Sequence, residues 1–93
     1  MSDNKIEFFA EEYKEENWFD FSRCFSNIVI EKNIKLQVPE DVMKSIIGLV
    51  GEESALNWIE VRLRQLEFTT AIDLAKSDKG LKALKAMIMR MPN

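Results

Sequence analysis

Apolar residues recur at intervals of three and four along most of the chain, which is the spacing of one buried face of a helix. This pattern predicts helices over residues 3–16, 18–32, 39–50, 52–67 and 79–91, with a short helix over residues 70–75. Only residues 33–38 alternate apolar and polar side chains as a strand does, and a lone strand has nothing to pair with. We therefore expect an extended connector there, within an all-α fold. The expected architecture is a compact small bundle of about five to six helices, forming a single domain over residues 1–93.

Residues that commonly begin or end a helix agree with these boundaries. The predicted starts are Asn17, Pro39, Thr70 with Asp73, and Ser77 or Asp78; the predicted ends are Gly51 and Pro92. The helix over 52–67 has the clearest period, and its inward side is expected to carry Leu56, Ile59, Leu63 and Leu66. The single cysteine, Cys24, stands among apolar residues and is expected to be a buried small hydrophobe.

Charge is separated between the two ends of the chain. The net charge is −3, but residues 1–20 hold seven acidic residues against two lysines, a net −5. Residues 74–93 hold five basic residues against one aspartate, a net +4. Such asymmetry indicates either that one end lies on the other or that the domain has two separate binding faces.

The residue types that most often carry catalysis or hold metals are scarce. The chain has no histidine and one cysteine, so neither the commonest general base nor a zinc site of the usual ligands can be built. Its three glycines are dispersed, so no phosphate-binding loop is present. We therefore expect a protein that is not an enzyme and needs no cofactor.

Localisation is inferred from the absence of sequence features typical of membrane spans and secretory signals. No apolar run reaches the roughly 18 residues of a membrane span, and no basic region followed by an apolar one opens the sequence. A single cysteine suits a reducing compartment. These features predict a cytoplasmic protein with no membrane partner.

The predicted helix over residues 79–91 has a basic outer face. Lys82, Lys85 and Met89 share that face, whereas Leu84 and Ile88 point toward the core. Lysines can contact phosphates, but the absence of interleaved aromatic residues and the acidic net charge argue against nucleic acid. Methionines are common on adaptable protein surfaces, so a protein partner is favoured. The residues expected to bind it are Lys82, Lys85, Met89, Arg90 and Met91.

The second half of the chain resembles a known family. Residues 51–93 are similar to the Xre/MbcA/ParS-type toxin-binding domain at the C-terminus of certain bacterial antitoxins. The similarity consists of an acidic turn before an Ala-aliphatic-x-Trp-aliphatic segment, a Thr-x-aliphatic-Asp-aliphatic step, a Ser-x-x-Gly helix start and a final Arg-aliphatic pair. The corresponding residues are Glu52, Glu53, Ala55, Leu56, Trp58 and Ile59, then Thr70, Ala71, Ile72, Asp73 and Leu74, then Ser77 and Gly80, and finally Met89, Arg90 and Met91.

The chain departs from the family pattern in three places. Residues 64–68 stand where the family usually has a Gly-Gly or Asn-Pro loop, and Ala71 replaces the usual proline. Residues 1–50 are too short and too acidic to resemble the helix-turn-helix that often precedes the domain. The resemblance implies an antitoxin-like protein that neutralises a toxin enzyme by binding it, and the departures put DNA binding in doubt.

A different function is suggested by the acidic N-terminal region. Here the chain would be a small phage or mobile-element inhibitor of a host nuclease or defence complex. Its contacts would be carboxylates that mimic nucleic-acid phosphates, namely Glu11, Glu12, Glu15 and Glu16. The identity of the partner and the oligomeric state, including a homo-oligomer, stay open at the level of sequence.

Overall fold

The computed structural model of the chain describes residues 5–30 and 36–91, and this part is all-α as expected. Its helices are α1 (Lys5–Glu12), α2 (Glu15–Arg23), α3 (Glu40–Val50), α4 (Glu52–Trp58), the 3-10 helix η1 (Arg64–Leu66), α5 (Ala71–Leu74) and α6 (Asp78–Ile88). The only β-type pairing among these residues is an isolated bridge between Leu63 and Thr69. None of the described helices is long and apolar enough to span a bilayer.

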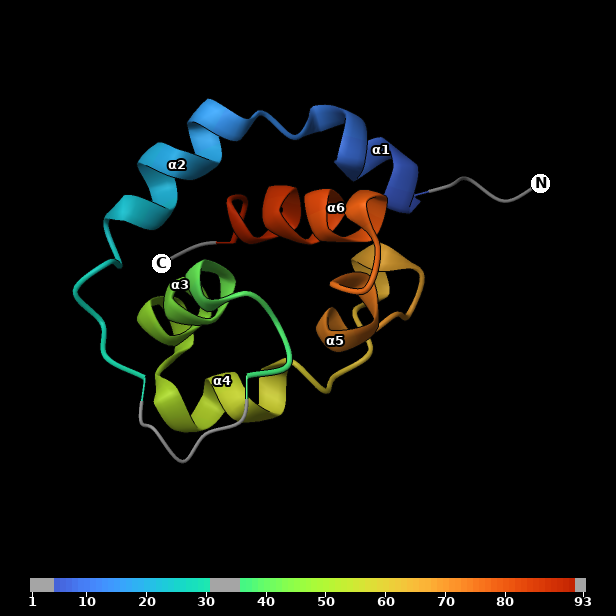
Figure 1. Cartoon of the computed structure of the whole chain (residues 1–93). Coiled ribbons are helices and arrows are strands. Elements are labelled where there is room, and N and C mark those ends of the chain that lie inside the picture. The colour runs from blue at the N-terminus through green and yellow to red at the C-terminus, as the bar shows by residue number, and fades with distance from the viewer. Residues whose placement is uncertain (1–4, 31–35, 92–93) are drawn as a thin grey trace.

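Helix α6 runs through the middle of the molecule, and the other helices surround it (Figure 1). Helix α1 lies along α6, so the acidic start of the chain is packed on its basic end. Helices α3 and α4 form a pair on the opposite side of α6, and α5 leads directly into it. The largest fully buried side chains come from α3, η1 and α6: Val42, Met43, Ser45, Ile46, Leu66, Leu84 and Ile88.

Three of the predicted helix signals are confirmed in the second half of the chain. Gly51 ends α3 with a positive φ of 94°, a conformation that costs glycine little. The Thr70 hydroxyl accepts a hydrogen bond from the backbone N–H of Asp73 at 3.2 Å, and that of Ser77 accepts one from Gly80 at 3.0 Å. These caps are local, so the sequence pattern was sufficient to predict them.

The predicted helix over residues 3–16 is wrong in its extent, because the chain bends at Tyr13 and Lys14. Lys14 has an extended backbone (φ −128°, ψ 123°) and precedes α2, so Asn17 lies inside that helix and does not cap it. Helix α2 also ends at Arg23, well before residue 32. Its last turn tightens into i→i−3 hydrogen bonds, from Phe25 N–H to Ser22 and from Ser26 N–H to Arg23.

The predicted helix over residues 52–67 is likewise too long, since α4 ends at Trp58. The chain then doubles back, with Leu63 N–H donating to the Thr69 carbonyl at 3.0 Å. Leu63 and Leu66 are still buried, but they reach the core from this turn and not from a helix face. Leu56, which was expected to point inward, is 37% exposed, whereas Ala55 and Ile59 are the buried positions on either side of it.

Two further expectations concern the connector before α3 and the single cysteine. The connector predicted over 33–38 falls partly outside the described residues; within the described part, Val38 is buried and Leu36 is 41% exposed. The prediction that Cys24 is buried is wrong. This residue follows the last turn of α2 and is exposed, with its thiol 3.7 Å from the Asp20 carbonyl oxygen.

Candidate functional site

The basic face of α6 is largely occupied by acidic side chains of the same chain. Lys79 Nζ lies 3.9 Å from a carboxylate oxygen of Glu7, and Arg90 pairs with Glu12. Both acids belong to α1. Of the two explanations for the charge asymmetry, the structure therefore shows the first, in which one end of the chain lies on the other.

The five residues predicted to bind a partner do not form one exposed face. Lys82 and Arg90 are exposed, whereas Lys85, Met89 and Met91 are partly buried. The Arg90 guanidinium stacks near the rings of Phe8 and Phe9, with its central carbon 5.9 and 5.4 Å from their centroids. Most of this predicted surface is therefore used to hold α1 against α6.

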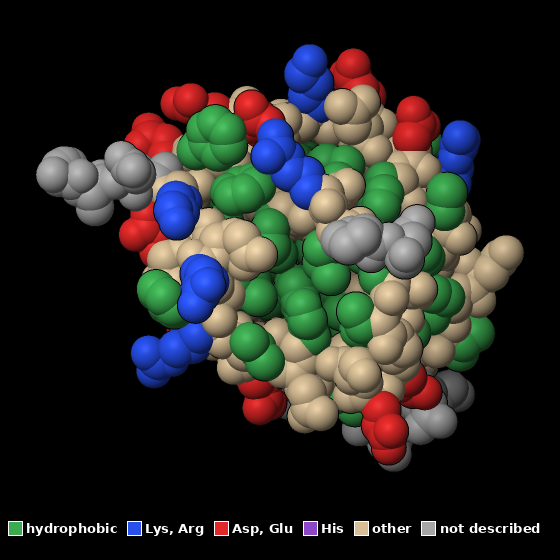
Figure 2. Space-filling model, turned by 180° about the vertical axis from the view of Figure 1, so that it is seen from behind, with side chains coloured by type: hydrophobic (Ala, Val, Ile, Leu, Met, Phe, Trp, Pro, Cys, Tyr) green, Lys and Arg blue, Asp and Glu red, His purple; other side chains and the backbone are tan. Residues whose placement is uncertain are grey.

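A shallow apolar hollow remains at the C-terminal end of α6. It has a volume of about 260 Å³ and is lined by Phe9, Gln65, Met87, Arg90 and Met91. Figure 2, which views the molecule from behind, shows hydrophobic side chains gathered across the middle of this side. Part of the predicted site, Arg90 with Met91, thus borders an accessible apolar surface.

The four acidic residues of the alternative site are divided by the bend at Tyr13 and Lys14. Glu11 and Glu12 belong to α1, where Glu12 is engaged with Arg90. Glu15 and Glu16 form the first turn of α2 and are both exposed. Only this second pair lines one of the two larger hollows of the described surface.

Lys85 connects three helices beneath that hollow. Its ammonium lies 5.7 Å from the centroid of the Tyr13 ring, 5.4 Å from that of Trp18 and 3.9 Å from Asp41. The Trp18 indole N–H donates to the Asp41 carboxylate at 2.8 Å, and the backbone N–H of Val42 donates to the other oxygen at 2.8 Å. The Asp41 carboxylate is therefore well supplied with partners, and it ties the buried face of α2 to α3 and α6.

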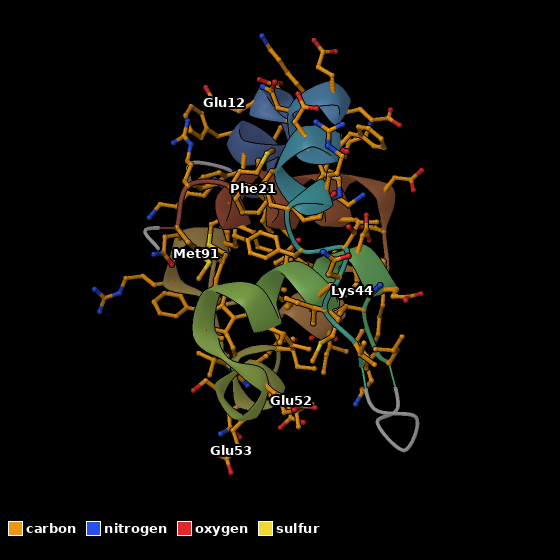
Figure 3. The ribbon with its side chains drawn as sticks, turned by 90° about the vertical axis from the view of Figure 1, so that its left-hand side faces the viewer. Glu12, Phe21, Lys44, Glu52, Glu53 and Met91 are labelled. Carbon is orange, nitrogen blue, oxygen red and sulfur yellow. The ribbon has the colours of Figure 1, made fainter. Side chains whose placement is uncertain are left out.

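Two hollows of about 570 Å³ each meet at Phe19 between α2 and the start of α3. Phe19, Ser22 and Asp41 line both hollows, so together they form one continuous surface, which we call the α2–α3 groove. Phe19 is 62% exposed in its middle. Lys44, at one end of the groove, and Met91 lie on opposite sides of the molecule in Figure 3, so the groove and the apolar hollow are separate surfaces.

The lining of the α2–α3 groove is acidic. Its carboxylates are Glu15, Glu16, Asp20, Glu40 and Asp41, and its cations are Arg23, Lys44 and Lys85. Each cation is already paired, with Asp20 at 3.6 Å, Glu40 at 3.3 Å and Asp41 at 3.9 Å respectively. Glu15 and Glu16 have no such partner among the described residues, so they leave the groove with an uncompensated negative charge.

The environment of Tyr13 reflects this charge. Burial of the hydroxyl raises the pKa of Tyr13 above its usual value of 10.0, and the carboxylates of Glu15 and Asp41 raise it further. The phenol is neutral at physiological pH, as a tyrosine with the usual pKa also is. It can take part in the groove as a hydrogen-bonding and aromatic group.

Sequence reasoning missed the central residues of this groove. Phe19 stands next to Trp18 and therefore on a different face of α2, one turn after Glu15 and Glu16, where a large aromatic side chain is not expected. That placement was the available signal. Asp41 was missed because its contacts to Trp18 and Lys85 join residues far apart in sequence.

Within residues 5–30 and 36–91, no group of three or more His, Cys, Asp or Glu side chains is arranged to hold a metal ion. The groove thus offers aromatic surface and carboxylates as its binding groups. No family model matches the chain, and no curated protein or solved structure matches it either.

Proposed function

We propose that this chain is a non-catalytic protein-binding domain whose α2–α3 groove accepts a basic segment of a partner protein. The observation that carries the proposal is Phe19, a phenyl ring 62% exposed where the two hollows meet, one of which is lined by more carboxylates than cations. Exposed aromatic rings beside concave surfaces are typical anchors of protein interfaces. Covering the exposed part of this ring would contribute about 1–2 kcal/mol to binding.

The charge of the groove supports a basic partner. Glu15 and Glu16 lack internal ion pairs among the described residues, so lysine or arginine side chains of a partner would gain interactions without breaking existing ones. Lys85 provides an example within the fold, since it sits between aromatic rings and the Asp41 carboxylate. A cationic side chain of a partner would meet the same kinds of group.

Proteins that handle nucleic acids present basic surfaces of this kind. The groove therefore favours an inhibitor of a nuclease or defence complex, as a phage or mobile element would encode, over a binder of an acidic partner. Of the four acids expected for that function, Glu15 and Glu16 line the groove, and Phe19 adds the apolar contact that phosphate mimicry alone would lack. The exposed thiol of Cys24 suits a reducing cytoplasm.

An antitoxin-like function is the second candidate, and a backbone feature supports it. Glu67 and Phe68 have positive φ angles of 61° and 57°, which Gly and Asn adopt with less strain. They stand where the antitoxin family usually has a Gly-Gly or Asn-Pro loop. In that case the partner would be a toxin enzyme, and it would contact Lys82, Arg90 and Met91.

Matched charge reversals separate these functions. The test variant is Glu15→Lys with Glu16→Lys in the first turn of α2, and the control is Glu52→Lys with Glu53→Lys in the first turn of α4. Figure 3 shows Glu52 and Glu53 at the far end of the molecule from Glu12. Both double variants lose the same favourable interaction with a helix dipole, so they differ only in location.

The measurement is quantitative mass spectrometry of proteins captured from the source cell by each tagged variant. We expect the captured partner to fall at least tenfold with the α2 variant and to be unchanged with the α4 control. Equal capture by the two variants would show that the partner does not bind in the groove. Loss only with Lys82→Glu and Arg90→Glu would instead support the antitoxin-like function.

A further inference from the structure

The bend between α1 and α2 is not encoded by a helix-breaking residue. Residues 5–23 contain neither glycine nor proline, although the apolar stripe shifts to another side of the helix between Tyr13 and Trp18. The backbone is extended at Lys14. A straight helix over residues 5–23 is therefore compatible with the sequence, and it would recover hydrogen bonds that the bend leaves out.

Contacts to α6 and η1 are what hold α1 in its bent position. None of the eight residues of α1 is fully buried, although Ile6, Phe9 and Ala10 pack against the core. The polar contacts are exposed: Glu7 with Lys79, Glu12 with Arg90, and the Lys5 backbone N–H with Glu67 at 2.8 Å. Exposed pairs of this kind are weak individually, so the packing of Ile6, Phe9 and Ala10 against the core supplies most of what holds α1 in place.

We propose that α1 is exchanged between two copies of this chain, each copy placing its α1 on the α6 of the other. Every contact that α1 makes within one chain is available without change from a second copy, because the two surfaces are identical. Charge complementarity between the acidic α1 and the basic α6 selects this occupant. A straight helix over residues 5–23 is roughly 28 Å long, which carries α1 out of reach of its own α6.

Repulsion between acidic side chains opposes the exchange. In a continuous helix Glu11 would lie one turn from Glu15, and Glu12 one turn from Glu16, and like charges at this spacing are unfavourable. The bend interrupts the helix between these two pairs of glutamates, since α1 ends at Glu12 and α2 begins at Glu15. Added salt screens this repulsion, so the exchanged dimer is favoured as ionic strength rises. This inference does not depend on the α2–α3 groove.

Two substitutions at Lys14 test the proposal. Lys14 is exposed, so replacing it changes little besides the helical tendency of the bend. Lys14→Ala favours a continuous helix about fivefold over Lys14→Gly, and an exchanged dimer contains two such continuous helices. Sedimentation velocity should therefore give a dimer dissociation constant about 25-fold lower for Lys14→Ala than for Lys14→Gly. Equal dimerisation of the two variants, or none up to millimolar concentration, would overturn the proposal.

Cross-linking identifies the exchange itself. Two chains are mixed in a Cys24→Ser background, one carrying Glu12→Cys and the other Arg90→Cys, since these positions are in contact between α1 and α6. A short cross-linker that reacts with two thiols should join the two chains. The yield of cross-linked dimer should be increased by Lys14→Ala and decreased by Lys14→Gly. A dimer without this cross-link would show that the copies associate by another surface, and the proposal would be wrong.

Discussion

Asp41 is the residue on which the arrangement of the groove depends most. Its carboxylate accepts hydrogen bonds from the Trp18 indole and the Val42 backbone and lies 3.9 Å from Lys85. These partners come from three helices, so one side chain sets how α2, α3 and α6 meet. Lys85 is the cation at this junction, and its side chain is only 16% exposed.

Lys85→Ala is expected to lower the free energy of unfolding by about 1–2 kcal/mol, because it removes a partly buried ion pair and two cation–π contacts. Lys82→Ala, on the exposed side of the same helix, is the matched control and should change it by less than about 0.5 kcal/mol. Urea unfolding of both variants measures the difference. Equal effects would show that Lys85 is only a surface residue.

Tyr13 predicts a pH dependence. Its raised pKa means that the folded chain holds the phenolic proton more tightly than the unfolded chain, in which the pKa is about 10. The resulting stabilisation is complete below about pH 10 and is lost as the pH rises through the folded-state pKa. Stability should thus fall more steeply above pH 10 in the wild type than in Tyr13→Phe.

Tyr13 is the only tyrosine, so the ultraviolet absorbance of tyrosinate reports its titration directly. A measured pKa at or below 10 in the folded chain would contradict the described burial of the hydroxyl. The comparison with Tyr13→Phe cancels the titration of lysines, which also lose their protons in this range.

At the scale of elements, local signals predicted helix ends better than helix lengths. Gly51, Thr70 and Ser77 act on backbone groups within three residues, so their roles were readable from the sequence. The early end of α4 at Trp58 was not predicted, because apolar periodicity continues through Leu63 and Leu66. Both residues reach the core by a turn with left-handed backbone at Glu67 and Phe68. Neither position is a glycine or an asparagine, so this turn could not be predicted from the sequence.

Gly80, in the first turn of α6, allows a prediction about how α5 and α6 pack. A Cβ atom on Gly80 would lie 2.3 Å from the Leu74 carbonyl oxygen, because α5 and α6 meet there at close range. Gly80→Ala should therefore lower the free energy of unfolding by about 1–3 kcal/mol, although alanine favours a helix by about 1 kcal/mol over glycine. Thermal unfolding followed by circular dichroism measures whether the substitution lowers or raises the stability. An increase in stability would mean that α5 and α6 are not in close contact.

At the scale of the whole molecule, the fold class was predictable and the surface was not. Periodicity gave an all-α architecture, since each helix needs one apolar face whatever its partner. The charge asymmetry left two arrangements open, and only the packing of α1 on α6 shows which one the chain adopts. That packing pairs Lys79 and Arg90 with acidic side chains of α1. Phe19 stays exposed beside Glu15 and Glu16, which have no ion pair among the described residues.

The measurement that tests this account most directly is photo-cross-linking in the source cell. A photoreactive phenylalanine analogue replaces Phe19, or Phe68 as a control, whose 61% exposure matches the 62% of Phe19. We predict that the analogue at position 19 captures one partner protein through a segment rich in lysine and arginine, and that the analogue at position 68 does not. Capture of the same partner only from position 68, or of an acidic segment from position 19, would contradict binding of a basic partner in the α2–α3 groove.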